Sequence, residues 1–138
     1  NHRVAPLICY EIVYPELVAR SARRAELMVT ISNDSWFGRS IGPLQHLEMA
    51  RMRALENGRY LLRGTNNGVS AIIDHRGRIV ARSEQFVEAT VTGQAEVMLG
   101  HTPFTSFGST PILVALAVLL ASMALLYRTF WRDDELPG

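Results

Sequence analysis

Short apolar runs alternate with amphipathic stretches along the first hundred residues of the chain, and this alternation predicts an α/β domain. The runs Val4–Cys9 and Glu26–Ser32 are bounded by polar residues, as expected of buried strands. Pro15–Arg24 begins with proline and ends with arginines, which is typical of a short helix. In Pro43–Tyr60 the apolar residues share one stripe, which predicts a longer helix. Strands that alternate with helices favour a mixed sheet.

Further strands are predicted after the second helix. Leu61–Thr65, Val69–Asp74 and Ile79–Ser83 are short apolar runs, and the last two are joined by a turn in which Gly77 can take a positive φ. Phe86–Val97 alternates apolar and polar residues, so the pattern predicts one more strand there.

The pattern changes near the C-terminus. No charged residue lies between His101 and Arg128, and Pro111–Tyr127 is continuously apolar or small. An apolar helix needs about 20 residues to cross a bilayer, with a lower limit of about 17. We therefore predict a transmembrane helix over residues 106–127, with aromatic residues at its far end as an interfacial belt. A buried core helix is the alternative interpretation.

Arginines near this helix predict its orientation. Arg128 and Arg132 follow it, whereas no arginine lies between Arg82 and its start. The positive-inside rule then puts residues 128–138 in the cytoplasm and the domain of residues 1–105 on the other side, which is the periplasm in a Gram-negative bacterium.

Composition excludes several classes of function. Fourteen basic residues, all of them arginine, against thirteen acidic residues give a net charge of +1, which argues against a nucleic-acid-binding protein. The single cysteine excludes an internal disulfide framework and a cysteine-rich metal site, and the histidines have no metal-ligand spacing. We expect no metal and no cofactor. The chain opens on Asn1 and runs at once into an apolar stretch, as if cut from a larger protein.

Candidate chemistry begins at Cys9, which ends a predicted strand where α/β folds tend to place reacting groups. A thiol there is able to attack an acyl carbonyl, with the backbone N–H of Tyr10 helping to hold the oxyanion and Glu11 orienting or protonating a substrate. A small buried cysteine and a solvated carboxylate are the plainer alternatives. Trp36, in the predicted loop Asn33–Gly42, either lines a pocket, inserts into lipid or pins its loop to the core.

Several motifs in order along the chain resemble a known family. Leu7–Glu11 (LICYE) and Thr30–Gly38 (TISNDSWFG) are similar to the nucleophile segment and the following strand and loop of the nitrilase, or carbon–nitrogen hydrolase, superfamily. More narrowly, Ala50–Glu56, Leu62–Gly68 and Gly100–Phe104 resemble the apolipoprotein N-acyltransferases, which also have a terminal membrane helix.

This resemblance implies part of a nitrilase-like α-β-β-α sandwich, followed by one C-terminal transmembrane helix, in the bacterial inner membrane. It implies an enzyme that takes an acyl chain from a phospholipid as a cysteine thioester and passes it to the N-terminal diacylglyceryl-cysteine of apolipoproteins. Cys9 matches the nucleophile, Tyr10 and Glu11 the important pair after it, and Trp36 the tryptophan of the active-site loop.

One departure from the family pattern affects this interpretation. The family uses a Glu-Lys-Cys triad whose Glu and Lys precede the cysteine, and this chain contains no lysine. We therefore expect a C-terminal part of the enzyme that is inactive alone. Two alternatives stay open: a membrane-tethered carbon–nitrogen hydrolase acting as an amidase, in which water replaces the amine acceptor, and a non-catalytic, membrane-anchored domain of the same fold.

Overall fold

The computed structural model describes the backbone of residues 1–132 in two compact units, residues 1–108 and 109–138, which we describe separately. Residues 133–138, the end of the predicted cytoplasmic tail, lie outside the described residues.

A five-stranded mixed sheet is the centre of the first unit. Its strands are β1 (Val4–Ile8), β2 (Leu27–Asn33), β3 (Leu61–Asn66), β4 (Ala71–Ile73) and β5 (Ile79–Arg82). They follow their chain order across the sheet, with β1, β2 and β3 parallel and with β4 and β5 antiparallel to their neighbours. The predicted α/β class with a mixed sheet is confirmed.

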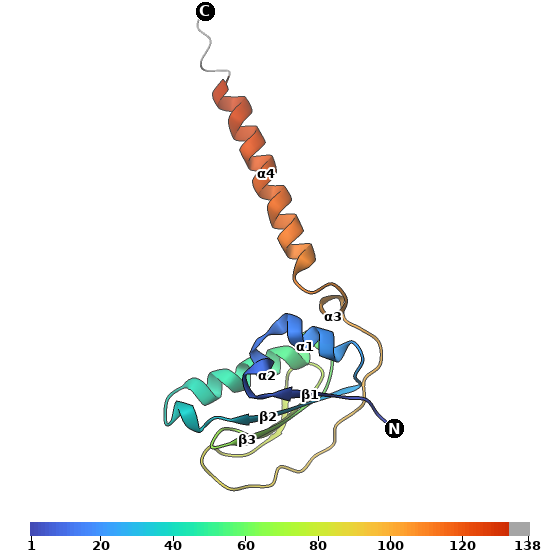
Figure 1. The fold of residues 1–138 in the computed structure, drawn as a ribbon, viewed down its shortest axis with the longest axis vertical. Helices are drawn as coiled ribbons and strands as arrows, with labels where there is room; N and C mark the ends of the chain where they lie inside the picture. Colours follow the sequence, from blue (N-terminus) through green and yellow to red (C-terminus); the bar gives the residue numbers. More distant parts are fainter. Residues whose placement is uncertain (133–138) are drawn as a thin grey trace, which may run out of the picture. The chain divides into compact units, whose positions relative to one another are not determined.

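Two predicted helices and three unpredicted short ones accompany the sheet. Helices α1 (Pro15–Ala22) and α2 (Gly42–Asn57) lie on one face of it (Figure 1). The 3₁₀ helices η1 (Cys9–Val13) and η2 (Ser35–Phe37) and the single-turn helix α3 (Pro103–Phe107) are too short to show a helical period in the sequence.

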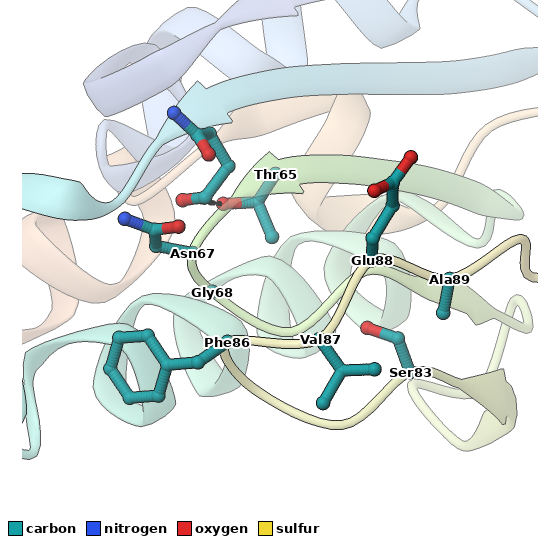
Figure 2. Close-up of a pocket in the computed structure, with 9 residues that line it drawn as sticks. Thr65, Asn67, Gly68, Ser83, Phe86, Val87, Glu88 and Ala89 are labelled. Atoms are coloured by element: carbon teal, nitrogen blue, oxygen red, sulfur yellow. Dashed lines mark hydrogen bonds between the residues drawn. The ribbon is translucent and has the colours of Figure 1, made fainter.

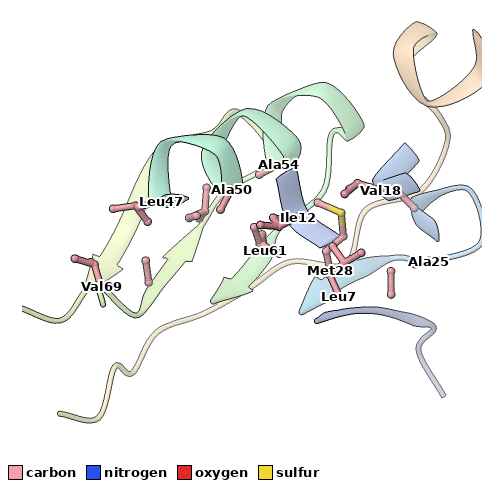
Figure 3. Close-up of a cluster of buried hydrophobic side chains, with 14 residues drawn as sticks. Leu7, Ile12, Val18, Ala25, Met28, Leu47, Ala50, Ala54, Leu61 and Val69 are labelled. Carbon is pink, nitrogen blue, oxygen red and sulfur yellow. The ribbon is translucent and has the colours of Figure 1, made fainter. Parts of the chain in front are cut away.

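The core lies between the sheet and these helices (Figure 3). Strand residues Leu7, Met28 and Leu61 point toward the helices and are fully buried. On α2 the facing stripe contains the small residues Ala50 and Ala54, so the helix packs closely against the strands. Close packing of α2 brings its N-terminal half near the ends of the parallel strands.

The opposite face of the sheet is less covered. Ile8 and Ile31 on this face are 59% and 62% exposed, although a parallel sheet usually buries both faces. The extended segment that follows β5 passes along this side (Figure 1), where residues 91–95 border a hollow above Val29 and Leu62.

The strand predicted over Phe86–Val97 is wrong. The segment begins in a turn, where Phe86 has a φ of 62°, and it forms no ladder with the sheet. From Val91 on it lies against the sheet face instead of beside an edge strand. At Gly93 the approach is so close that an added Cβ would lie 2.8 Å from Ile72 Cδ1. A two-residue alternation reports an extended chain with one apolar side, and it does not report which hydrogen bonds that chain makes.

Helix α4 (Thr110–Arg132) forms the second unit, and it begins four residues later than the predicted 106 and continues beyond 127. Gly108, with φ 60°, ends α3 and separates it from α4. Residues Thr110–Phe130 are long and apolar enough to cross a membrane by length and composition. Within α4, the hydroxyls of Ser122 and Thr129 donate to carbonyls one turn back, which satisfies them inside the helix.

Gly58 ends α2 with φ 58°, and an added Cβ would lie 3.0 Å from the Thr102 methyl group. We expect Gly58→Ala to lower the free energy of unfolding by about 1 kcal/mol, because alanine is strained at positive φ. Gly58→Asn adds the same Cβ but tolerates this backbone better, so it should cost less. Denaturant unfolding of both variants checks this; an equal loss would assign the effect to the Thr102 contact alone.

Candidate active site

The parallel strands β1, β2 and β3 end at one edge of the sheet, and the predicted site residues follow the first two of them. Cys9 comes directly after β1, begins η1, and carries a free, half-buried thiol. Its φ is 50°, a left-handed conformation that costs a non-glycine residue energy. A strand that turns this sharply into a helix presents its first side chain at the sheet edge, as α/β enzymes do with reacting groups.

Tyr10 and Glu11 form the first turn of η1 with Cys9. The Glu11 carboxylate reaches back and accepts a hydrogen bond of 2.7 Å from the backbone N–H of Ile8, so it braces the turn that carries Cys9. The N–H groups in the first turn of a helix have no partner within it, which is the property an oxyanion donor at Tyr10 needs. The Tyr10 ring is half-exposed and lies edge-on to Tyr14 at 5.9 Å between ring centroids.

Trp36 lies in η2, the turn after β2, and its side chain is 87% exposed. Asn33 shapes this turn, because its side-chain oxygen accepts a 3.1 Å hydrogen bond from the Ser35 N–H. Phe37, next to Trp36, is less exposed, and its ring centroid lies 6.3 Å from that of His46. Thus the Trp36 turn and the Cys9 turn follow neighbouring parallel strands.

A buried polar cluster behind these two turns was not predicted from the sequence. Asp34 Oδ2 accepts a 2.6 Å hydrogen bond from Arg63 Nη2, and Asp34 Oδ1 lies 2.9 Å from His46 Nδ1. All three side chains are 3% exposed or less. They come from the end of β2, from α2 and from β3. Asp34 was part of a recognised motif, but nothing in the sequence paired it with residues 12 and 29 positions away.

Burial lowers the pKa of the Arg63 guanidinium from its ordinary value, while the Asp34 carboxylate and, more weakly, the charge of Cys9 oppose that shift. Arg63 Nη1 and His46 Nε2 are buried without a hydrogen-bond partner among the described residues.

A hollow of about 490 Å³ lies beyond the end of β3, at the same sheet edge. Figure 2 shows it between the turn after β3 and the segment after β5, with Glu88 and Thr65 on one side and Phe86 on the other. Cys9 is not among the lining residues. Asn67 and Phe86 do line the hollow, and like Cys9 they have a positive φ. These three are the non-glycine residues with positive φ in the described part of the chain.

Residues 2–102 match the family model of the carbon–nitrogen hydrolases. The chain belongs to the carbon–nitrogen hydrolase family. Its fold agrees, because a solved carbon–nitrogen hydrolase from Helicobacter pylori superposes with a TM-score of 0.56 at 17% identity, over 63% of this chain and 38% of that one.

Curated relatives give a narrower comparison. An apolipoprotein N-acyltransferase from Azotobacter vinelandii is 57% identical over 99% of this chain and 26% of its own length. The corresponding protein from Pseudomonas putida is 53% identical over 87% of this chain and 24% of its own length. The resemblance to the carbon–nitrogen hydrolases and to the apolipoprotein N-acyltransferases is therefore confirmed. The chain spans about a quarter of the length of these curated relatives.

The geometry predicts how Glu11 acts. If Glu11 serves mainly to accept from the Ile8 N–H, Glu11→Gln should retain at least a third of the reactivity of Cys9, because an amide oxygen also accepts. Glu11→Ala should lower it by at least tenfold, because the turn loses its brace. The rate of Cys9 alkylation by iodoacetamide, followed by peptide mass spectrometry, measures both. Equal losses in the two variants would instead require the negative charge.

Proposed function

We propose that this chain is the C-terminal part of an apolipoprotein N-acyltransferase, in which Cys9 carries an acyl chain from a phospholipid to the N-terminal diacylglyceryl-cysteine of an apolipoprotein. The observation that carries the proposal is the Cys9 turn: a free thiol at the carboxyl end of a parallel strand, in a left-handed conformation, at the head of a helical turn. The names of the curated relatives support the choice of reaction.

In the first half-reaction, Cys9 Sγ attacks the ester carbonyl of the phospholipid and forms an S–C bond. The Tyr10 N–H donates to the developing oxyanion, and the collapse of the tetrahedral intermediate breaks the ester C–O bond and releases a lysophospholipid. The thiol proton passes through a general base to the leaving alkoxide oxygen. The lysine-free chain leaves the family's Glu and Lys to be supplied by sequence outside it.

The second half-reaction regenerates the thiol. The α-amino group of the diacylglyceryl-cysteine attacks the thioester carbonyl, the C–N amide bond forms, and the C–S bond breaks. A proton of the amine passes through the general base to the Cys9 sulfur. A thioester is more reactive toward an amine than the original ester, so one difficult transfer becomes two easier ones. Trp36, exposed beside the Cys9 turn, suits contact with the lipid part of either substrate.

The open face of the sheet supports the idea that the fold continues outside the chain. Apolar residues such as Ile8 and Ile31 stay exposed there, and an α/β sheet needs both faces covered. We infer that the second sheet of an α-β-β-α sandwich packs on this face in the full-length enzyme and brings the general base toward Cys9.

Residues 106–127, most of which lie in α4, form the proposed transmembrane segment. The most apolar stretch of Thr110–Phe130 has no residue buried within the chain. This exposure favours lipid over a protein core as the surroundings of these residues. With Arg128 and Arg132 on the cytoplasmic side, the catalytic domain of residues 1–105 faces the periplasm and the tail 128–138 the cytoplasm. The enzyme then works at the outer surface of the bacterial inner membrane, where its phospholipid donor lies.

The decisive measurement is the intact mass of the full-length enzyme in phospholipid micelles, for wild type and Cys9→Ser. We expect an acyl-sized increase on the wild type only, removed by hydroxylamine and by a diacylated apolipoprotein-like peptide. If no adduct forms when the acceptor is withheld, the nucleophile assignment is wrong and the non-catalytic alternative gains. If water clears the adduct as fast as the peptide does, the amidase alternative gains.

Introducing a carboxylate on the exposed apolar face of the sheet tests whether a second sheet packs there in the full-length enzyme. Ile31→Asp should lower the yield and thermal midpoint of the full-length enzyme strongly, because an unpaired buried carboxylate costs several kcal/mol. Leu99→Asp is the matched control: Leu99 is also apolar, is 80% exposed, and lies outside the sheet. Similar behaviour of the two variants would mean that the sheet face stays in water.

A further inference from the structure

The buried cluster of Asp34, His46 and Arg63 joins the two turns of the candidate site. Asp34 directly precedes the Trp36 turn, and its carbonyl accepts from the Phe37 N–H at 3.1 Å. His46, held by the Asp34 carboxylate, contacts both sides: its ring lies 6.4 Å from Tyr10 and 6.3 Å from Phe37. One imidazole ring is therefore within ring-contact distance of both the residue after the nucleophile and the residue after the exposed tryptophan.

The cluster itself has little freedom to move. Arg63 holds Asp34 through Nη2 and donates through Nε to the Val69 carbonyl at 3.3 Å, which fixes it to the turn after β3. Asp34 packs so closely on Gly68 that a Cβ at that position would lie 2.3 Å from Oδ2. Gly68 is thus required for space. His46 Nδ1 lies 2.9 Å from Asp34 Oδ1 and 3.2 Å from Arg63 Nη2, and a proton on Nδ1 lets it donate to the carboxylate, which only accepts.

Such a cluster is costly for stability alone. Two opposite charges with fully buried side chains lose their hydration, and a well-packed apolar replacement is often equally stable. Reacting groups, by contrast, must be held within a fraction of an ångström, and a 1 Å error costs about 100-fold in rate. The cluster also reaches the nucleophile turn by geometry, because the His46 ring lies 6.4 Å, between ring centroids, from Tyr10, the residue directly after Cys9.

We propose that Asp34, His46 and Arg63 are positioning residues that set the Cys9 turn and the Trp36 turn relative to one another for acyl transfer. The His46 ring is the contact between the turns, and the Asp34–Arg63 pair fixes the orientation of that ring. This inference rests on the proposed function for the reaction that the residues serve. The effect of the cluster on the position of the Cys9 thiol does not depend on that reaction and is measured separately.

Two variants separate the parts played by His46 in the full-length enzyme. His46→Asn keeps a donor near the Nδ1 position for Asp34 and loses the ring, whereas His46→Phe keeps the ring and loses the donor. Glu56→Gln is the matched control, because Glu56 lies on the same helix and pairs with the largely buried Arg53 at 3.0 Å. The readouts are single-turnover thioester formation at Cys9, KM for the phospholipid, iodoacetamide alkylation of Cys9, and the thermal midpoint.

We expect His46→Asn to lower the rate of thioester formation by about 100-fold with KM within threefold, and to change the alkylation rate at least threefold. His46→Phe should retain more of the rate than His46→Asn, and Glu56→Gln should stay within threefold of wild type. The thermal midpoints should not follow the rates.

The proposal is overturned if His46→Asn reacts like the control, if the rates merely follow the thermal midpoints, or if neither His46 variant folds, because the cluster would then serve only the fold. A wild type that forms no thioester contradicts the proposed function instead. The alkylation rates of the same variants still decide the positioning role in that case.

Discussion

The arrangement of this domain depends most on the interactions that the buried Asp34 carboxylate makes with Arg63 and His46. The carboxylate lies at the end of β2, binds a guanidinium from β3 and an imidazole from α2, and leaves room for nothing larger than glycine at position 68. A buried carboxylate without such partners would cost several kcal/mol, so strand, helix and turn must meet at this point. The relative positions of the Cys9 and Trp36 turns follow from it.

Parallel strand pairing supplies the second constraint. Since β1, β2 and β3 run in one direction, the turns that follow them gather at one edge of the sheet, and residues far apart in the sequence become neighbours. The Cys9 turn, the Trp36 turn and the hollow beyond β3 all lie at this edge. The same sheet keeps apolar side chains such as those of Ile8 and Ile31 exposed on its other face.

Most strands and helices could be predicted from the sequence because secondary structure depends largely on residues that are close together in the chain. The apolar runs identified the five strands, proline and arginine identified α1, and the stripe of apolar residues identified α2. Phe86–Val97 failed because its alternation describes an extended chain that packs on the face of the sheet and not beside its edge. α4 begins after the predicted 106 because Gly108, with a φ of 60°, ends the preceding short helix α3.

The sequence by itself determined the α/β class, the apolar C-terminal helix and the candidates Cys9, Tyr10, Glu11 and Trp36, since motifs and periodicity are short-range properties. Only the tertiary structure decided that Cys9 adopts a left-handed conformation, that Glu11 braces its turn, and that one imidazole links the two turns. The buried cluster arises from contacts of Asp34 with residues 12 and 29 positions away, and no local pattern encodes which polar side chains will share a buried volume.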